Sequence, residues 1–221
     1  MMHRIIKRLS PVLGYLLMRY LSKPRPYKYK GIRIIVHPGV FYPGFIYSTR
    51  ILLDWIEKED LAGKKFLELG AGSGIISLVA ARKGALVTAS DINPVATASL
   101  VENSRENNIF VNCVHSDLFE QINEEHFDYI VIAPPYYPLD PKNMRERAWF
   151  CGKNFEYFNR LFDQLRSHCD EGTGVIMILS EDCNLDRISS IASENGFTLQ
   201  EVHRKKRFWE WNFIYRILKI T

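Results

Sequence analysis

The sequence has 221 residues, of which 47% are hydrophobic and 24% are charged, and its formal net charge is +4 at pH 7. Such a composition is typical of a soluble globular protein with room for one sizeable core. The four cysteines are scattered without a C-x-x-C pair and the six histidines show no ligand spacing, so the sequence indicates neither a disulfide framework nor a metal site.

The positive charge is concentrated near the N-terminus. Residues 1–30 contain eight basic residues and no acidic one, whereas the remaining 191 residues contain 21 basic and 25 acidic residues. This basic arm predicts a polyanionic partner, RNA or an acidic membrane surface, although a solvated leader docked on the body fits the same pattern. Its apolar run from Leu9 to Met18 is shorter than the ~20 residues that span a bilayer. It predicts a short amphipathic helix, then a loop through residues 23–26, and we expect a cytoplasmic protein.

Strand and helix patterns alternate along most of the chain. An apolar strand at residues 31–36, turned toward residues 40–42, predicts a hairpin ahead of a helix over residues 50–56 with Ser48 or Thr49 as N-cap. Short apolar runs then predict strands at residues 66–69, 86–90, 111–114, 127–132, 174–179, 197–202 and 213–220. Amphipathic segments predict helices at residues 74–83, 95–107, 155–168 and 184–194.

This alternation predicts an α/β fold with a mainly parallel sheet covered by helices on both faces. The last two strands have no helix between them, so we expect them to form an antiparallel pair. We divide the chain into the basic arm, residues 1–30, and one domain, residues 31–221, in which residues 31–60 lead into the sheet.

A glycine-rich turn connects the strand at residues 66–69 to the following helix. Glycines at every second position, Gly70, Gly72 and Gly74, remove Cβ where the backbone turns sharply and a ligand approaches. The spacing differs from the G-x-G-x-x-G of dinucleotide sites. Glu68, two residues earlier, would repel a pyrophosphate and attract a ligand with an ammonium or sulfonium group. The turn therefore favours S-adenosylmethionine over a nicotinamide cofactor, although a tight strand-to-helix connection without a ligand is the simpler alternative.

Two carboxylates follow the next strands. Asp91 ends its strand 21 residues after Gly70, where an acidic residue accepts hydrogen bonds from ribose hydroxyls. Asp117 follows the third strand, where a carboxylate can accept the adenine amino group. Each also has a structural interpretation, Asp91 as a carboxylate near the N-cap Asn93 and Asp117 as a turn residue.

The fourth strand ends in Ala133-Pro134-Pro135-Tyr136. Consecutive prolines remove two backbone donors and fix the chain direction, which leaves carbonyl groups to face the crevice. Tyr136 offers a flat surface on which a base or a peptide group can stack. A Pro-Pro pair also simply ends strands, but this one lies at the sheet edge that carries the glycine turn.

In order, residues 68–74, 91–94, 116–119 and 133–136 resemble the motifs of class I S-adenosylmethionine-dependent methyltransferases, and more narrowly the HemK-like "small-domain" branch. That resemblance covers roughly residues 40–185. It implies a Rossmann-like fold with a seven-stranded, mainly parallel sheet, an antiparallel last strand and helices on both faces. Members of this branch modify glutamine amides in proteins or exocyclic amines in RNA and DNA bases.

The resemblance also implies roles for individual residues. The methionine part of S-adenosylmethionine would lie against Glu68 and the glycine turn, with Asp91 at the ribose. Ile92 would pack on adenine and Asp117 would meet its amino group, with Leu118 beside it. The full set implied for the cofactor comprises Ser48, Thr49, Glu68, Gly70, Ala71, Gly72, Gly74, Asp91, Ile92, Asp117 and Leu118, and that for the acceptor comprises Ala133, Pro134, Pro135 and Tyr136.

One position departs from the family pattern, since Ala133 stands where the family has Asn. In the family, the Asn side chain and the first proline carbonyl hold the target nitrogen while the tyrosine stacks on it. Ala133 deletes one acceptor, a loss of about 1–3 kcal/mol, or one to two powers of ten in rate. We expect a methyltransferase acting on an RNA base amine; the alternatives are a protein amide, a different acceptor atom, or an impaired cofactor-binding scaffold that binds RNA or a partner protein.

Two further regions are candidates for contact with the acceptor. Arg204-Lys205-Lys206-Arg207 precedes Phe208, Trp209 and Trp211 at the expected turn of the last strand pair, and interleaved cations and rings suit nucleic acid. A solvated hairpin with packed aromatics fits equally well. Residues 145–149, after the proline loop, are placed to shape an acceptor pocket.

Overall fold

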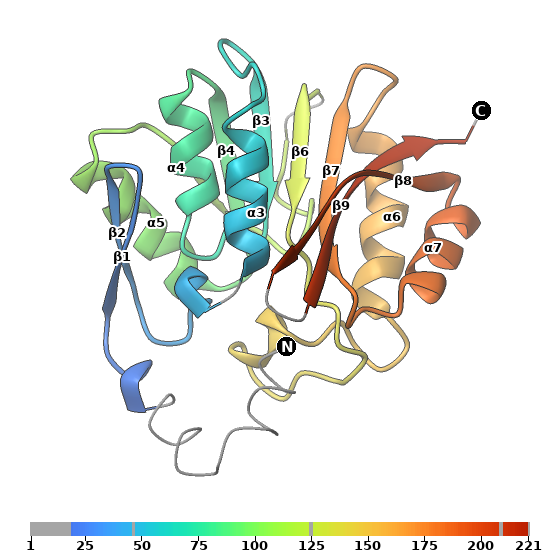
Figure 1. The fold of residues 1–221 in the computed structure, drawn as a ribbon, viewed down its shortest axis with the longest axis horizontal. Helices are drawn as coiled ribbons and strands as arrows, with labels where there is room; N and C mark the ends of the chain where they lie inside the picture. Colours follow the sequence, from blue (N-terminus) through green and yellow to red (C-terminus); the bar gives the residue numbers. More distant parts are fainter. Residues whose placement is uncertain (1–18, 46, 124–125, 208–209, 221) are drawn as a thin grey trace.

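The computed structural model describes residues 19–45, 47–123, 126–207 and 210–220. Its centre is a seven-stranded sheet in the order β5-β4-β3-β6-β7-β9-β8 (Figure 1). The strands are β3 (Lys65–Leu69), β4 (Leu86–Asp91), β5 (Asn112–His115), β6 (Tyr129–Ile132), β7 (Gly174–Ser180), β8 (Phe197–Arg207) and β9 (Glu210–Lys219).

Strand direction follows from the connections. β3, β4, β5, β6 and β7 pair in parallel because a crossover connects each to the next. β9 pairs antiparallel with both β7 and β8, which confirms the antiparallel last pair expected from the sequence. The sheet order reverses between β3 and β6, and ligands of open α/β sheets bind beyond the carboxyl ends of the strands at such a reversal.

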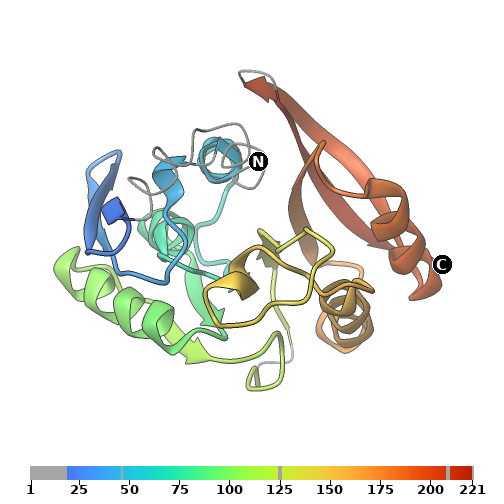
Figure 2. The same cartoon turned by 90° about the horizontal axis from the view of Figure 1, so that it is seen from below.

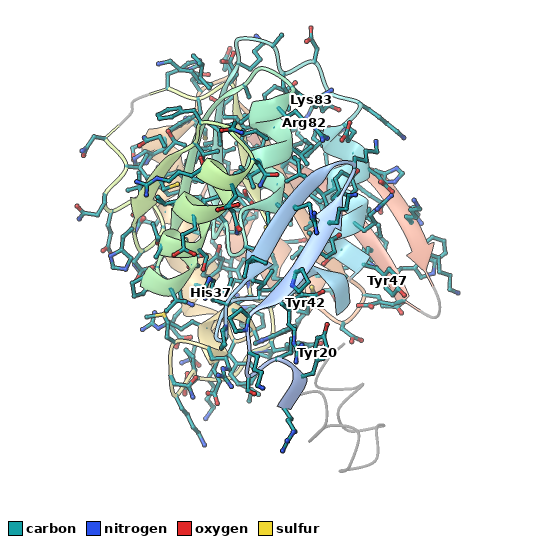
Figure 3. The ribbon with its side chains drawn as sticks, turned by 90° about the vertical axis from the view of Figure 1, so that its left-hand side faces the viewer. Tyr20, His37, Tyr42, Tyr47, Arg82 and Lys83 are labelled. Carbon is teal, nitrogen blue, oxygen red and sulfur yellow. The ribbon has the colours of Figure 1, made fainter. Side chains whose placement is uncertain are left out.

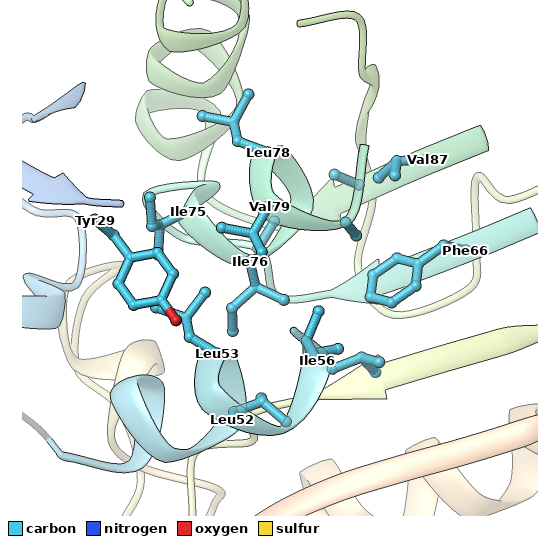
Figure 4. Packing of buried hydrophobic residues seen from close by; sticks show 14 of the residues in the cluster. Tyr29, Leu52, Leu53, Ile56, Phe66, Ile75, Ile76, Leu78, Val79 and Val87 are labelled. Carbon is cyan, nitrogen blue, oxygen red and sulfur yellow. The ribbon is translucent and has the colours of Figure 1, made fainter. Parts of the chain in front are cut away.

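Helices cover both faces of the sheet, as the alternation predicted. One apolar cluster packs α3 (Tyr47–Ile56) and α4 (Ile75–Arg82) on one face, with Leu100 of α5 (Pro94–Glu106) in the same cluster. Figure 4 shows Leu52, Leu53 and Ile56 meeting the α4 side chains over Phe66. A second cluster packs α6 (Glu156–His168) and α7 (Leu185–Glu194) on the other face. None of the helices in the described ranges has the length and apolarity needed to cross a bilayer.

The N-terminal hairpin differs from the prediction. Its strands are β1 (Arg25–Tyr29) and β2 (Ile32–Val36), which pair antiparallel, so the partner of the predicted strand precedes it rather than following it. The loop expected through residues 23–26 is therefore wrong from Arg25 onward. The signal was obscured because Arg25, Pro26 and Lys28 interrupt the apolar pattern of β1, and Pro26 and Lys28 lie on its exposed face.

Side-chain amides fasten this hairpin to the body. The Asn103 amide pairs with both the backbone N–H (2.8 Å) and the backbone carbonyl (3.1 Å) of Ile35, and Asn107 does the same with Arg33. At the turn, Arg82 of α4 donates to the Lys30 carbonyl, and Figure 3 shows Arg82 and Lys83 beside that end of the hairpin. Two helices thus hold the hairpin by hydrogen bonds to its open edge.

Other boundaries shift by a few residues. Helix α3 begins at Tyr47, so Ser48 and Thr49 lie in its first turn and neither is its N-cap. The prediction for the later helix was correct, since Asn93 caps α5 and accepts a hydrogen bond from the Val95 N–H at 3.0 Å. β8 runs on to Arg207, so the predicted basic cluster lies within a strand and not beyond it. Residues 1–18, and with them the predicted amphipathic helix, lie outside the described residues.

Candidate functional site

A pocket with an empty volume of about 1120 Å³ opens at the carboxyl ends of β3, β4, β6 and β7. The loop between β6 and α6 crosses the same edge of the sheet, at the centre of the view from below in Figure 2. The predicted residues that line this pocket are Ser48, Thr49, Glu68, Gly70, Ala71, Gly72, Asp91, Ile92, Ala133, Pro134, Pro135 and Tyr136.

Glu68 is the most deeply buried carboxylate in the pocket wall. Its side chain is 3% exposed and accepts hydrogen bonds from the backbone N–H of Ser77, at 2.8 Å, and from the Ser77 hydroxyl. Burial outweighs these bonds and raises the pKa of Glu68 to about 8. The carboxylate has no basic side chain beside it among the described lining residues, so it is suited to a cationic ligand group.

Asp91 connects two parts of the site. One carboxylate oxygen accepts from the Gly72 N–H at 2.7 Å, and the other accepts from the Asn93 N–H at 2.8 Å. Burial raises the pKa of Asp91, and these two bonds oppose the increase. Each oxygen keeps a second lone pair, which can accept a hydroxyl of a bound ligand. Asp91 can therefore hold the glycine turn and contact a ligand at the same time.

Gly70 and Gly74 have different surroundings in the glycine turn. Gly70 has a φ of 71° and lines the pocket, and a Cβ there would meet no protein atom within 4 Å, so it would project into open space. Gly74 has a φ of 78° and lies at the N-terminus of α4, where a Cβ would collide with the Leu100 side chain. Gly74 is not among the residues that line the pocket, so the structure places it in helix packing rather than against a ligand.

Asp117 and Leu118 lie around a neighbouring cavity of about 1020 Å³. Gly70, Ile92, Pro135 and Arg147 line both cavities, so the two adjoin. The Asp117 carboxylate is bonded to Arg160 of α6 at 2.9 Å, a partner that the sequence did not reveal. Asp117 therefore lines a cavity that Gly70 of the glycine turn also borders, and this cavity adjoins the main pocket, an arrangement that suits an extended ligand.

The proline loop forms the pocket wall beside the glycine turn, because Ile132 at the end of β6 pairs with Leu69 at the end of β3. Ala133 is exposed to the pocket, Pro134 is buried, and the Tyr136 ring lies 4.8 Å from that of Tyr137. Burial raises the pKa of Tyr136 well above its ordinary range, so the phenol is neutral. A neutral ring beside backbone carbonyls can stack on a flat group, but it cannot supply a phenolate base.

The sequence analysis did not predict, or predicted only in part, several of the residues that line the pocket. Phe41, from the loop before α3, lies 5.0 Å from the ring of Trp149, and these two side chains close one side of the pocket. The connection expected to be a polar loop folds back through η2 (Glu146–Ala148) and a bridge between Tyr137 and Phe150. It brings Met144, Arg147, Ala148 and Trp149 to the pocket, whereas Arg145 and Glu146 do not line it.

Two of the four cations in the predicted basic cluster, Arg204 and Lys205, pair with acidic side chains. Arg204 pairs with Glu201 at 2.5 Å and Lys205 with Asp54 of α3 at 3.5 Å, while Lys206 lies 5.5 Å from the Trp211 ring. In the described part of the arm, Lys30 pairs with Glu57 and Arg25 stacks on Tyr20. Surface pairs of this kind are weak, but they reduce the charge available to a polyanion.

The pocket chemistry fits S-adenosylmethionine. A sulfonium and an ammonium group offer the positive charge that the buried Glu68 requires, and Gly70 leaves open the space that a Cβ would fill. Asp91 retains acceptor capacity for hydroxyl groups next to this seat. A phosphate-bearing dinucleotide would instead oppose the ionisation of Glu68, so its binding would gain nothing from this carboxylate.

Comparisons with known proteins agree with this chemistry. The family model of the methyltransferase small domain matches residues 31–145. A putative protein N5-glutamine methyltransferase of Methanocaldococcus jannaschii is 34% identical over 156 residues, which cover 68% of this chain and 76% of that protein. A tRNA1(Val) (adenine(37)-N6)-methyltransferase of a Flavobacteriaceae bacterium is 29% identical over 121 residues, which cover 53% of this chain and 51% of that one.

The Mtq2 chain of the solved Mtq2–Trm112 complex of E. cuniculi, described as responsible for methylation of the eRF1 translation termination factor, has the same fold. It is 25% identical with a TM-score of 0.60, and the match covers 83% of this chain and 99% of that one. The acceptors named for these relatives include both RNA and protein. The family model and the archaeal relative together decide the family, and the chain belongs to the HemK-like small-domain methyltransferases, enzymes that use S-adenosylmethionine as methyl donor.

Proposed function

We propose that this protein transfers the methyl group of S-adenosylmethionine to an exocyclic amine of an RNA base. The observation that carries the choice of acceptor is the position of Arg147. Arg147 is the only basic residue among the described lining of the main pocket, it is exposed, and it also lines the adjoining cavity. A guanidinium beside a flat slot suits a nucleotide, whose base enters while its phosphate stays outside.

The cofactor would extend along both cavities. Glu68, Ala71 and Gly72 would hold the methionine part, Asp91 the ribose hydroxyls, and Ile92, Asp117 and Leu118 the adenine. Ser48 and Thr49, in the first turn of α3, would close the methionine end. When bound, the cofactor supplies an electrophilic methyl group on its sulfur.

The acceptor would enter between the proline loop and the closing pair Phe41 and Trp149. The Pro134 carbonyl would accept an N–H of the target amine, and the Tyr136 ring would stack on the base and exclude water. Methyl transfer needs little covalent help from the protein, so holding the nitrogen in line with the methyl group supplies most of the rate. The basic arm, residues 1–30, supports RNA binding by its charge.

A protein amide is the second candidate acceptor. The named function of the archaeal relative favours it, and a side-chain amide has the planar shape and the N–H groups that the proline loop suits. The Arg147 guanidinium would then face an acidic side chain of the substrate protein.

Labelled cofactor distinguishes these possibilities. The full chain is incubated with methyl-labelled S-adenosylmethionine and separate pools of cell-derived RNA and protein, and we expect label in RNA. Nuclease digestion to nucleosides would then identify the base. Arg147→Ala should raise the KM for RNA about tenfold and reduce the salt dependence of binding by about one phosphate contact.

Other outcomes are informative. Label confined to the protein pool would establish the amide as acceptor, and label in neither pool, with cofactor binding intact, would refute the proposed function. Weaker cofactor binding in Arg147→Ala would instead assign this side chain to the cofactor carboxylate. Arg145→Ala is the matched control because Arg145 does not line the pocket.

A further inference from the structure

One face of α6 holds the turn that follows β5. Arg160, Gln164 and His168 are spaced four residues apart along the helix, so their side chains lie in one row. Arg160 donates a hydrogen bond to the Asp117 carboxylate at 2.9 Å. Gln164 accepts one from the Phe119 N–H at 3.1 Å, and the His168 ring stacks on that of Phe119 at 4.3 Å. The turn at Asp117 is therefore held from a helix 43 residues along the chain.

The backbone of this turn is strained. Leu118 has a φ of 55°, in the left-handed region that residues other than glycine rarely adopt. The buried Ser116 hydroxyl stabilises this conformation, since it donates to the Leu118 carbonyl at 2.9 Å and accepts from the Gln121 N–H at 3.0 Å. Asp117 and Leu118 both line the cavity that adjoins the main pocket. A strained turn that is held by several contacts beside a cavity points to a role in binding.

The Arg160 guanidinium leaves one oxygen of Asp117 open. Its Nη1 donates to Asp117 Oδ2 at 2.9 Å and its Nη2 donates to Glu120 at 2.8 Å, so two carboxylates fix the plane of the guanidinium. Asp117 Oδ1 receives no hydrogen bond within the part of the chain that the structure describes, and the side chain is 27% exposed. Because a carboxylate can only accept, Oδ1 offers a ligand in the cavity an acceptor and no donor.

We propose that Arg160 and Gln164 are positioning residues that give the cofactor site its preference for adenine over a 6-oxopurine. This inference rests on the proposed function, in which the adenine lies against Asp117. A 6-amino group can donate to Asp117 Oδ1, whereas a 6-oxo group would set its own lone pairs against the carboxylate. Arg160 fixes this carboxylate, and Gln164 fixes the backbone that carries it. Without them the carboxylate can turn away from the base, and the preference falls.

Two ligands that differ at one position of the purine test this inference. S-adenosylhomocysteine carries a 6-amino group and S-inosylhomocysteine a 6-oxo group, and calorimetric titration gives the ratio of their affinities without a methyl acceptor. We expect the wild type to prefer the adenine ligand about a hundredfold. Arg160→Gln should lower this preference about tenfold, and Arg160→Lys, which keeps one donor, should retain part of it. Arg166→Gln removes the same charge from an exposed position of α6 outside the cavity and should leave the preference unchanged.

Gln164 and Asp117 supply two further comparisons. Gln164→Leu removes the acceptor of the Phe119 N–H and should lower the preference, whereas Gln164→Glu keeps an acceptor there and should retain most of it. Asp117→Asn should remove the preference, because an amide can turn either its oxygen or its NH₂ group toward the purine. If Arg160 acts through Asp117, Arg160→Gln should not change the ratio further in the Asp117→Asn protein. An additional loss in the double variant would overturn the inference.

A merely structural role gives a different result, since it weakens both ligands equally. An unchanged ratio in folded Arg160→Gln protein would therefore overturn the inference, and if this variant does not fold, Arg160→Lys and Gln164→Leu make the same comparison. Wild-type protein that binds both ligands equally would also overturn it, even if that protein methylates RNA. A strong preference for adenine that depends on Arg160, with label transferred to neither the RNA nor the protein pool, would support the inference and refute the proposed function.

Discussion

The carboxylate of Asp91 accepts a hydrogen bond from the backbone N–H of Gly72 at 2.7 Å, which joins the end of β4 to the glycine turn of the neighbouring strand. The other oxygen receives the Asn93 N–H at the start of α5. One side chain therefore fixes three segments, and both of its predicted roles, at the ligand and near the N-cap Asn93, are compatible with this geometry. The site is organised before any cofactor arrives, and its affinity and its stability are linked.

Asp91→Asn is expected to weaken both properties. An amide oxygen accepts one of the two backbone bonds, but its NH₂ group meets a donor, so the free energy of unfolding should fall by about 1–3 kcal/mol. Cofactor affinity should fall at least tenfold because the turn is no longer held. Urea unfolding and calorimetric titration measure the two effects. Asp163→Asn, at an exposed position of α6, is the control, and a stable Asp91→Asn protein with normal affinity would contradict the argument.

Glu68 should make both stability and cofactor binding depend on pH. The folded-state pKa of about 8 lies above the ordinary value of 4.5, so the native protein binds more protons than the unfolded chain between these values. Stability must then fall as pH rises through that window, and Glu68→Gln should flatten the curve.

Binding has the opposite sign. A cationic cofactor group stabilises the ionised carboxylate, so the cofactor should bind more tightly from pH 6 to 8 and release a proton at pH 7. Calorimetry in buffers of different ionisation enthalpy detects this proton. Glu68→Gln should bind weakly at every pH, and equal proton release by both proteins on binding would show that Glu68 does not titrate.

Two alanine substitutions in the glycine turn should separate binding from folding. Gly70→Ala and Gly74→Ala share the strain of a positive φ, about 1 kcal/mol each. Only the Cβ at residue 74 collides with Leu100, whereas the Cβ at residue 70 points into open pocket space. We expect Gly74→Ala to lose more stability and Gly70→Ala to lose more cofactor affinity. Thermal unfolding with and without cofactor compares them, and the reverse ranking would be incompatible with this geometry.

Ala133→Asn restores the side-chain acceptor of the family pattern at an exposed position of the pocket wall. If the native acceptor is an amine or an amide, the new hydrogen bond should raise the rate of transfer by about ten- to a hundredfold. Single-turnover assays with labelled cofactor measure the change. Ala148→Asn, on the opposite side of the same pocket, controls for polarity alone. A rate that does not rise would indicate a different acceptor atom.

Much of the fold follows from local patterns. Asn93 followed by Pro94 predicts the start of α5 because its side chain caps the helix and proline needs no hydrogen-bond partner there. The parallel strands are recognisable because burial on both faces makes them continuously apolar. β1 lacks that signal, since Tyr29 is its one fully buried residue and Pro26 and Lys28 occupy its exposed face. The asparagine side chains that hold the other edge of the hairpin come from residues 103 and 107, more than 65 positions along the chain from the β2 residues they contact.

The site was predictable where motifs are local and was not where it depends on tertiary contacts. Glu68, Asp91 and the proline loop stand directly after strands, and parallel strands bring such positions to one edge. Ser180 obeys the same rule but carries no distinctive motif. Two contacts of the site, Phe41 with Trp149 and Asp117 with Arg160, join segments that are far apart in the sequence. Neither segment carries a local pattern that predicts its partner.

The β1–β2 hairpin, which Asn103 and Asn107 bind, limits how far this enzyme can be truncated from its N-terminus. The family match begins at residue 31, yet Tyr29 of β1 is 1% exposed and belongs to the main apolar cluster. A fragment trimmed to the homologous span would leave β2 without its ladder partner and uncover the space that this ring fills. Deletions that probe the cationic leader should therefore stop before Arg25, so that any loss of RNA binding is not confused with loss of folding.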